Sequence, residues 1–138
     1  MKTWMLFLLA CVLAFTATAQ ANSDTSLPLR KVYVLRPSAY TGALVKIKVS
    51  VNGHMLELPN SSFGVIECRA DSVVLKLANS RLSGESVRPL VTYRAETYYV
   101  TVPEPHAHKK GRLILTEVEK DSYDFYARKV SRQIYPNP

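Results

Sequence analysis

Residues 44–58 read LVKIKVSVNGHMLEL, and this stretch decides the fold class. Up to Val51 apolar and polar side chains alternate, with the valines and the isoleucine on one face and the lysines on the other. A period of two is typical of a strand with one buried face. Asn52-Gly53 tolerates the positive φ angles of a type I′ turn, and His54–Leu58 then alternates again. The stretch therefore predicts a β-hairpin that buries one apolar face.

Further strands are predicted on both sides of this hairpin. They are rich in β-branched and aromatic residues, and turn signals separate them. These strands cover Arg30–Arg36, Phe63–Cys68, Ser72–Ala78, Val87–Tyr93, Thr97–Val102 and Gly111–Val118. Pro89 has no backbone N–H, so its strand is expected at a sheet edge. Residues 30–120 are thus predicted to form an all-β domain. We expect a mainly antiparallel β-sandwich, Ig-like or transthyretin-like, of about seven or eight strands.

The C-terminal segment changes its period. One helical face would carry Tyr123, Tyr126, Ala127, Val130 and Ile134. This spacing predicts a short amphipathic helix over residues 121–135, with Asp121 or Ser122 as its cap. Tyr123, Phe125 and Ala127 also alternate as in a strand, so the pattern leaves helix and strand open here.

The N-terminal residues 1–19 have the features of a secretory signal peptide. Lys2 precedes an apolar run over residues 4–15, and the small residues 17–19 suit cleavage after Ala19. The run is shorter than the roughly 20 apolar residues of a spanning helix. Residues 20–29 are polar and are expected to be a flexible lead-in. The mature chain is expected in the periplasm or outside the cell, with no transmembrane segment.

The two cysteines bear on anchoring and on disulfides. Leu8-Leu9-Ala10-Cys11 resembles a lipobox, but residues 12–15 continue the apolar run where a polar tether is expected. We therefore favour cleavage over lipidation of Cys11. Cys68 would then be alone in the mature chain, without an intrachain disulfide. It is expected to be a small buried hydrophobe. A reactive thiol or an intermolecular disulfide is the alternative.

The chain has a formal net charge of +7, distributed along its length. This balance favours association with anionic envelope polymers or lipids. The sequence shows no basic helix or aromatic-interleaved stripe, so nucleic acid is not an expected partner. The candidate binding residues are Lys109, Lys110, Arg112, Arg128, Lys129 and Arg132. They would form one basic patch if the C-terminal segment lay beside the loop 103–110.

Arg36 precedes Pro37 at the end of a predicted strand. Such an arginine is either an anion clamp at the end of the sandwich or a tie to a neighbouring loop carbonyl or carboxylate. We favour the tie, and keep Arg36 among the candidate binding residues.

His106 and His108 are the candidate metal ligands. Two histidines two residues apart share one face of a strand and can hold a metal together. Here they lie in a Pro-rich loop followed by two lysines, which repel a cation. We therefore expect neither a specific metal site nor a cofactor.

Several motifs together resemble a known family. They are Val32–Ser38, Val49–Gly53, Arg94–Val100 and the strand 113–118. In this order they are similar to an exported bacterial domain of unknown function, whose pattern is like that of PEGA-type and carboxypeptidase-regulatory-like β-sandwiches. Residues 69–71 stand where that family has a Pro-Gly turn. The resemblance implies a sandwich fold and an exported location, and it implies no established activity.

No catalytic motif stands out. The sequence has no Gly-x-Ser-x-Gly elbow, and Glu117 and Glu119 fit a solvated strand end. We expect a non-enzymatic module that acts in binding or in envelope assembly. Its expected partner is an anionic polymer or another envelope protein, and its oligomeric state is open. The alternative is a secreted hydrolase whose site is assembled from scattered Ser, His and acidic residues.

Overall fold

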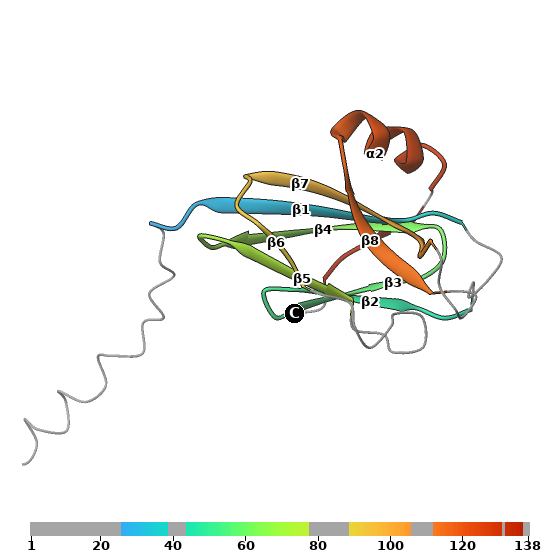
Figure 1. Ribbon diagram of the computed structural model, residues 1–138, viewed down its shortest axis with the longest axis horizontal. Helices are drawn as coiled ribbons and strands as arrows, with labels where there is room; N and C mark the ends of the chain where they lie inside the picture. The colour runs from blue at the N-terminus through green and yellow to red at the C-terminus, as the bar shows by residue number, and fades with distance from the viewer. Residues whose placement is uncertain (1–25, 39–43, 78–88, 106–111, 131, 137–138) are drawn as a thin grey trace, which may run out of the picture.

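The structure is a computed structural model that describes residues 26–38, 44–77, 89–105, 112–130 and 132–136. Its strands form two sheets, one of five strands in the order β8-β7-β1-β4-β9 and one of four in the order β3-β2-β5-β6 (Figure 1). The elements are β1 (Leu29–Arg36), β2 (Ile47–Val51), β3 (His54–Leu58), β4 (Ser62–Arg69), β5 (Val73–Leu77), β6 (Leu90–Thr92), β7 (Glu96–Pro103), β8 (Leu113–Val118), α2 (Lys120–Ala127) and β9 (Arg132–Ile134). The predicted all-β class with a short helix near the C-terminus is confirmed.

The strand pairing distinguishes the two predicted sandwich types. β1 pairs antiparallel with β4 and parallel with β7, and β9 runs parallel to β4. The other strand pairs are antiparallel. In an Ig-like sandwich the first two strands share a sheet. Here β1 and β2 lie in different sheets, so the strand order is not that of the Ig-like alternative.

The hydrophobic core fills the space between the two sheets. Alternate residues of β2, β3 and β5 face inward and meet those of β1, β4, β7 and β8. The core residues are Val32, Val34, Ile47, Val49, Val51, Leu56, Leu58, Ile66, Val73, Leu75, Leu77, Tyr99, Leu113 and Leu115. The inward face predicted for the hairpin is therefore the one that is buried.

The β2–β3 turn forms as the Asn-Gly signal predicts. Asn52 has a φ of 47° and Gly53 a φ of 86°. The Asn52 side chain also fastens the hairpin to β5. Its Nδ2 donates to the carbonyl oxygen of Ser72 at 3.0 Å, and its Oδ1 accepts from the backbone N–H of Val74 at 2.8 Å. The turn thus fixes the register of three neighbouring strands.

Strand boundaries differ from the predicted ones at several ends. β1 begins at Leu29, inside the segment predicted as a flexible lead-in. The carbonyl oxygen of Leu27 also accepts a hydrogen bond from Nη1 of Arg69 at 3.2 Å, so the end of the lead-in is tied to β4. β6 is shorter than predicted, and it is an edge strand, as Pro89 indicates.

The C-terminal segment corrects the prediction of a helix over residues 121–135. The helix α2 ends at Ala127, and Arg132–Ile134 form β9 instead. β9 pairs with the start of β4, which satisfies backbone groups that an edge strand would otherwise leave open. The helix begins after Glu119, which makes no side-chain cap, so the caps predicted at Asp121 or Ser122 are also wrong.

Helix α2 covers the outer face of the five-stranded sheet, over β7 and β1 (Figure 1). Tyr123 on the helix is 4% exposed. It packs against Tyr33 and Tyr98, whose rings stack with centroids 4.8 Å apart. This second apolar cluster also contains Leu35, Val100 and Val130. The helix is therefore held by aromatic packing rather than by its caps.

The Tyr123 hydroxyl should affect the stability of the fold. It is buried and has no hydrogen-bond partner among the described residues, and burial raises its pKa above the ordinary value of 10.0. Tyr123→Phe removes an unsatisfied polar group, so we expect the free energy of unfolding to rise by about 1 kcal/mol at pH 7. The pKa of Tyr123 is higher in the folded protein than in the unfolded chain. Part of the free energy of unfolding is therefore present below pH 10 and is lost as the pH rises above 10. Between pH 10 and 11 the free energy of unfolding of Tyr123→Phe should fall less than that of the wild type.

Urea denaturation at pH 7, 10 and 11 measures both effects. Tyr98→Phe is the control, since its hydroxyl donates to the Glu96 carboxylate at 2.9 Å and its loss should not stabilise the fold. A destabilised Tyr123→Phe would show that this hydroxyl has a partner in solution.

Candidate functional site

Arg36 lies at the end of β1 and is 1% exposed. Its Nη1 donates to the carbonyl oxygen of Leu58 at 3.0 Å and to that of Val45. Burial lowers the pKa of the guanidinium. These bonds join the end of β1 to the opposite sheet, where β3 ends. Arg36 thus binds backbone carbonyl oxygens, as in the structural alternative that we favoured from the sequence.

The other predicted binding residues that the structure describes belong to different elements. Arg112 pairs with Glu104, with 3.1 Å between Nε and the carboxylate oxygen. Arg128 follows the last residue of α2, and the Lys129 ammonium lies 4.3 Å from the centroid of the Phe125 ring. Lys109 and Lys110, together with the candidate metal ligands His106 and His108, lie outside the described residues.

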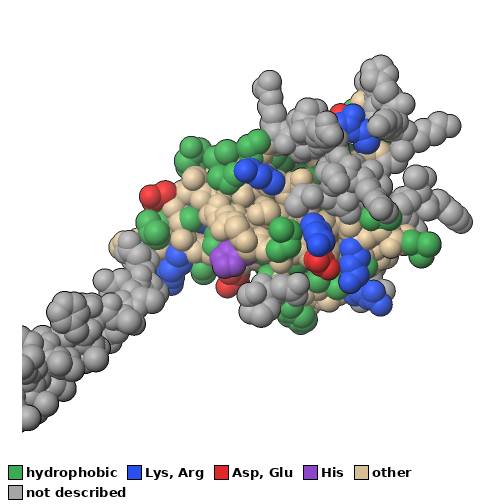
Figure 2. Space-filling model, turned by 90° about the horizontal axis from the view of Figure 1, so that it is seen from below, with side chains coloured by type: hydrophobic (Ala, Val, Ile, Leu, Met, Phe, Trp, Pro, Cys, Tyr) green, Lys and Arg blue, Asp and Glu red, His purple; other side chains and the backbone are tan. Residues whose placement is uncertain are grey.

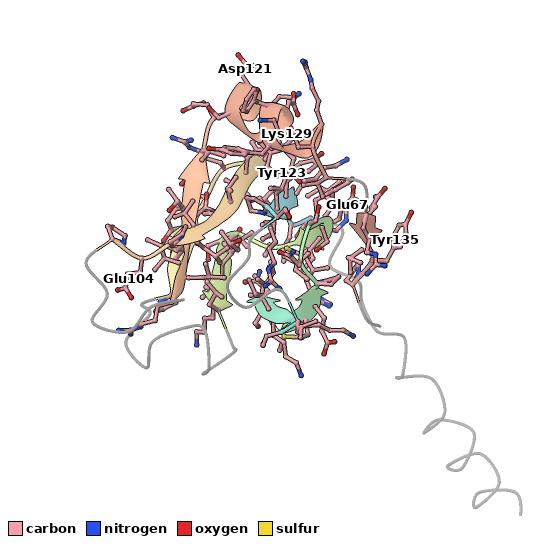
Figure 3. All side chains as sticks on the ribbon, turned by 90° about the vertical axis from the view of Figure 1, so that its right-hand side faces the viewer. Glu67, Glu104, Asp121, Tyr123, Lys129 and Tyr135 are labelled. Atoms are coloured by element: carbon pink, nitrogen blue, oxygen red, sulfur yellow. The ribbon has the colours of Figure 1, made fainter. Side chains whose placement is uncertain are left out.

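Arg112 and Arg132 belong to opposite edges of the five-stranded sheet. Arg112 immediately precedes β8, and Arg132 begins β9, the last strand on the other side. Figure 3 shows the same separation, because Glu104, the partner of Arg112, and Tyr135, which follows β9, lie on opposite sides of the molecule. Arg112 and Arg132 therefore lie apart in the structure.

A groove of about 410 Å³ lies between β3 and β9. Its lining residues are Lys46, Glu57, Pro59, Arg132, Gln133, Ile134 and Tyr135. One wall comes from the end of β3 and from the residue preceding β2, and β9 with the residue after it supplies the other wall. We call this feature the β3–β9 groove. Among the predicted binding residues that the structure describes, Arg132 lines this groove.

The charge of the groove is positive. The Glu57 carboxylate lies 3.7 Å from the Lys46 ammonium and 3.2 Å from the Lys48 ammonium. Lys48, which does not line the groove, thus shares this carboxylate with Lys46, and Arg132 is the second cation in the lining. Figure 2, which looks onto the outer face of the four-stranded sheet, shows basic side chains gathered near one end of this face around an acidic one. An anion entering the groove would meet an excess of positive charge.

Gly64 allows β9 to lie close to β4. A Cβ at this position would be 2.7 Å from a methyl carbon of Leu56 and 3.0 Å from the carbonyl oxygen of Ile134. Gly64 is also the register partner of Ile134. The missing side chain therefore permits the close approach that places β9, and with it one wall of the groove.

Part of the groove could have been found from the sequence. A two-residue turn at Asn52-Gly53 sets Lys48 opposite Glu57, and the structure has this pairing. Lys46 and Lys48 are both on the polar side of the alternation. Tyr135 and the pairing of β9 with β4 carry no such signal, because a three-residue strand is too short to show a period.

Cys68 and Ser62 each have a structural partner. Cys68 is a half-buried free thiol, its Sγ 3.8 Å from Nδ2 of Asn52, and burial raises its pKa. The Ser62 hydroxyl donates to the carbonyl oxygen of Pro59 at 2.6 Å. His54 is exposed beside the β2–β3 turn. Within the described ranges, no group of three or more His, Cys, Asp and Glu side chains is placed to hold a metal ion.

Arg36→Met tests the tie at the end of β1. The substitution keeps an apolar stem but leaves two carbonyl oxygens without their donor, which should lower the free energy of unfolding by about 1–3 kcal/mol. Urea denaturation measures the loss, and Arg128→Met, at an exposed position after α2, is the matched control. Equal stability of the two variants would contradict the structural role of Arg36.

Comparison with known proteins gives no match: no family model, no curated protein and no solved structure is similar to this chain. In the described part of the chain, no helix has the length and apolar character needed to cross a bilayer.

Proposed function

We propose that this chain is an exported, non-enzymatic β-sandwich module that binds an anionic polymer of the cell envelope. The observation that carries the proposal is the β3–β9 groove, where the cations Lys46 and Arg132 line a concave surface. Among the described lining residues the carboxylate is that of Glu57, which is paired with Lys46 and Lys48. A polymer chain can lie along such a groove and meet several cations in succession.

The strength of the attraction follows from exposure. The side chains of Lys46 and Lys48 are at least half exposed, so each contact to an anion is weak and is screened by salt. Several weak contacts along one polymer add, since each further contact is intramolecular once the first has formed. Binding should therefore depend on polymer length and on ionic strength.

Export rests on the features of residues 1–19. The hydrolase alternative has less support. The Ser62 hydroxyl donates to a backbone carbonyl, and His54 is exposed at the start of β3. We therefore favour binding.

A panel of immobilised polyanions tests the function. The panel consists of polygalacturonate, polyphosphate and poly-L-glutamate. At least one of these polymers should retain the mature protein at 50 mM NaCl. The apparent affinity for the retained polymer should fall at least tenfold by about 0.5 M NaCl, because the charges are solvent-exposed.

The double variant Lys46→Gln/Arg132→Gln should weaken this binding at least fivefold. The matched control is Arg112→Gln/Arg128→Gln, which removes the same charge away from the groove. An equal effect of both double variants would mean that net charge, and not the β3–β9 groove, causes the binding.

Mass spectrometry of the protein recovered from the envelope or medium tests export. The N-terminus is expected at Gln20, or at Asn22 if cleavage follows Ala21. A diacylglyceryl Cys11 would contradict a freely released module, and an intact Met1 in the cytosol would contradict export.

A further inference from the structure

We infer that the anionic polymer is an acidic polysaccharide, with Tyr135 as the platform for a sugar ring and Arg132 as the partner of its carboxylate. This inference rests on the proposed function and deepens it, since it selects one chemical class among polyanions. Its basis is that the β3–β9 groove is lined by an aromatic, an amide and two basic side chains.

Tyr135 supplies an apolar surface within a polar groove. Its side chain is 74% exposed, although it immediately follows β9 and lines the groove. Figure 3 shows it projecting from the side of the molecule, away from the core. The face of an aromatic ring is flat, apolar and electron-rich, and it suits the C–H face of a pyranose. An exposed tyrosine here is therefore a ready stacking surface.

The neighbouring groups match the rest of a sugar acid. The planar guanidinium of Arg132 suits bidentate contact with a carboxylate. The amide of Gln133 offers donors and an acceptor for ring hydroxyls, and Lys46 adds a second cation on the opposite wall. A uronic acid presents these same three features: an apolar ring face, hydroxyl groups and a carboxylate.

Other polyanions match fewer of the side chains in the groove. Polyphosphate has no ring to stack on Tyr135. An acidic peptide would add as a strand to an open sheet edge, but Pro59 follows β3 and Pro136 lies two residues beyond β9. Proline blunts strand addition, because it has no N–H to donate. A bilayer surface is too flat to fill a concave groove.

The experiment measures the affinity of oligogalacturonate for the mature protein by titration calorimetry. Fully methyl-esterified oligogalacturonate is the matched ligand, because it keeps the rings and removes the charge. Polyphosphate and poly-L-glutamate are the polyanions without rings. We expect the free acid to bind at least tenfold more tightly than its ester and than either of these polyanions.

The variants isolate the ring of Tyr135. Tyr135→Ala should weaken oligogalacturonate binding at least tenfold and leave the weak binding of poly-L-glutamate unchanged, while Tyr135→Phe, which keeps the ring, should bind as the wild type does. Tyr93→Ala is the control, since that tyrosine is 71% exposed away from the groove. Unchanged thermal unfolding of Tyr135→Ala would show that β9 remains in place.

The outcomes separate the two proposals. If ring-free polyanions bind as tightly as oligogalacturonate, or if Tyr135→Ala binds as the wild type does, the polysaccharide inference fails and the proposed function stands. If no polyanion binds, both fail.

Discussion

The burial of alternating apolar side chains between the two sheets is the constraint on which the rest of the structure depends. Val32 and Val34 of one sheet and Val49 and Val51 of the other are fully buried. Each such side chain contributes about 1.5–3 kcal/mol on transfer from water. Cys68 is a free thiol, so this core has no disulfide to support it within the described residues. A shift of one residue in register would turn these side chains outward.

Two features outside the core are packed or bonded onto the sandwich. Arg36 closes one end of the sandwich by joining β1 to the carbonyl oxygen at the end of β3. On the outer face of the five-stranded sheet, Tyr123 anchors α2, and the chain then returns to the edge of β4 as β9. The β3–β9 groove is a product of this return, because β9 and Tyr135 form one of its walls. The candidate site thus depends on the part of the chain that is packed onto the sandwich, not on the sandwich alone.

The sequence predicted what depends on local pattern. The alternation over residues 44–58 and the Asn52-Gly53 turn specify the hairpin, and Pro89 correctly indicated an edge strand. It could not predict pairing between distant segments. The parallel pairing of β1 with β7, and of β9 with β4, depends on which edges the folded sheet leaves open. For the same reason the sequence did not indicate that Lys46 and Arg132 line one groove.

The parallel pairing of β1 with β7 has a consequence for the rate of folding. Lys31 pairs with Glu96, so this pairing forms only after two segments far apart along the chain have come together. Contacts between residues so distant along the chain require closure of a long loop, and proteins rich in them fold slowly.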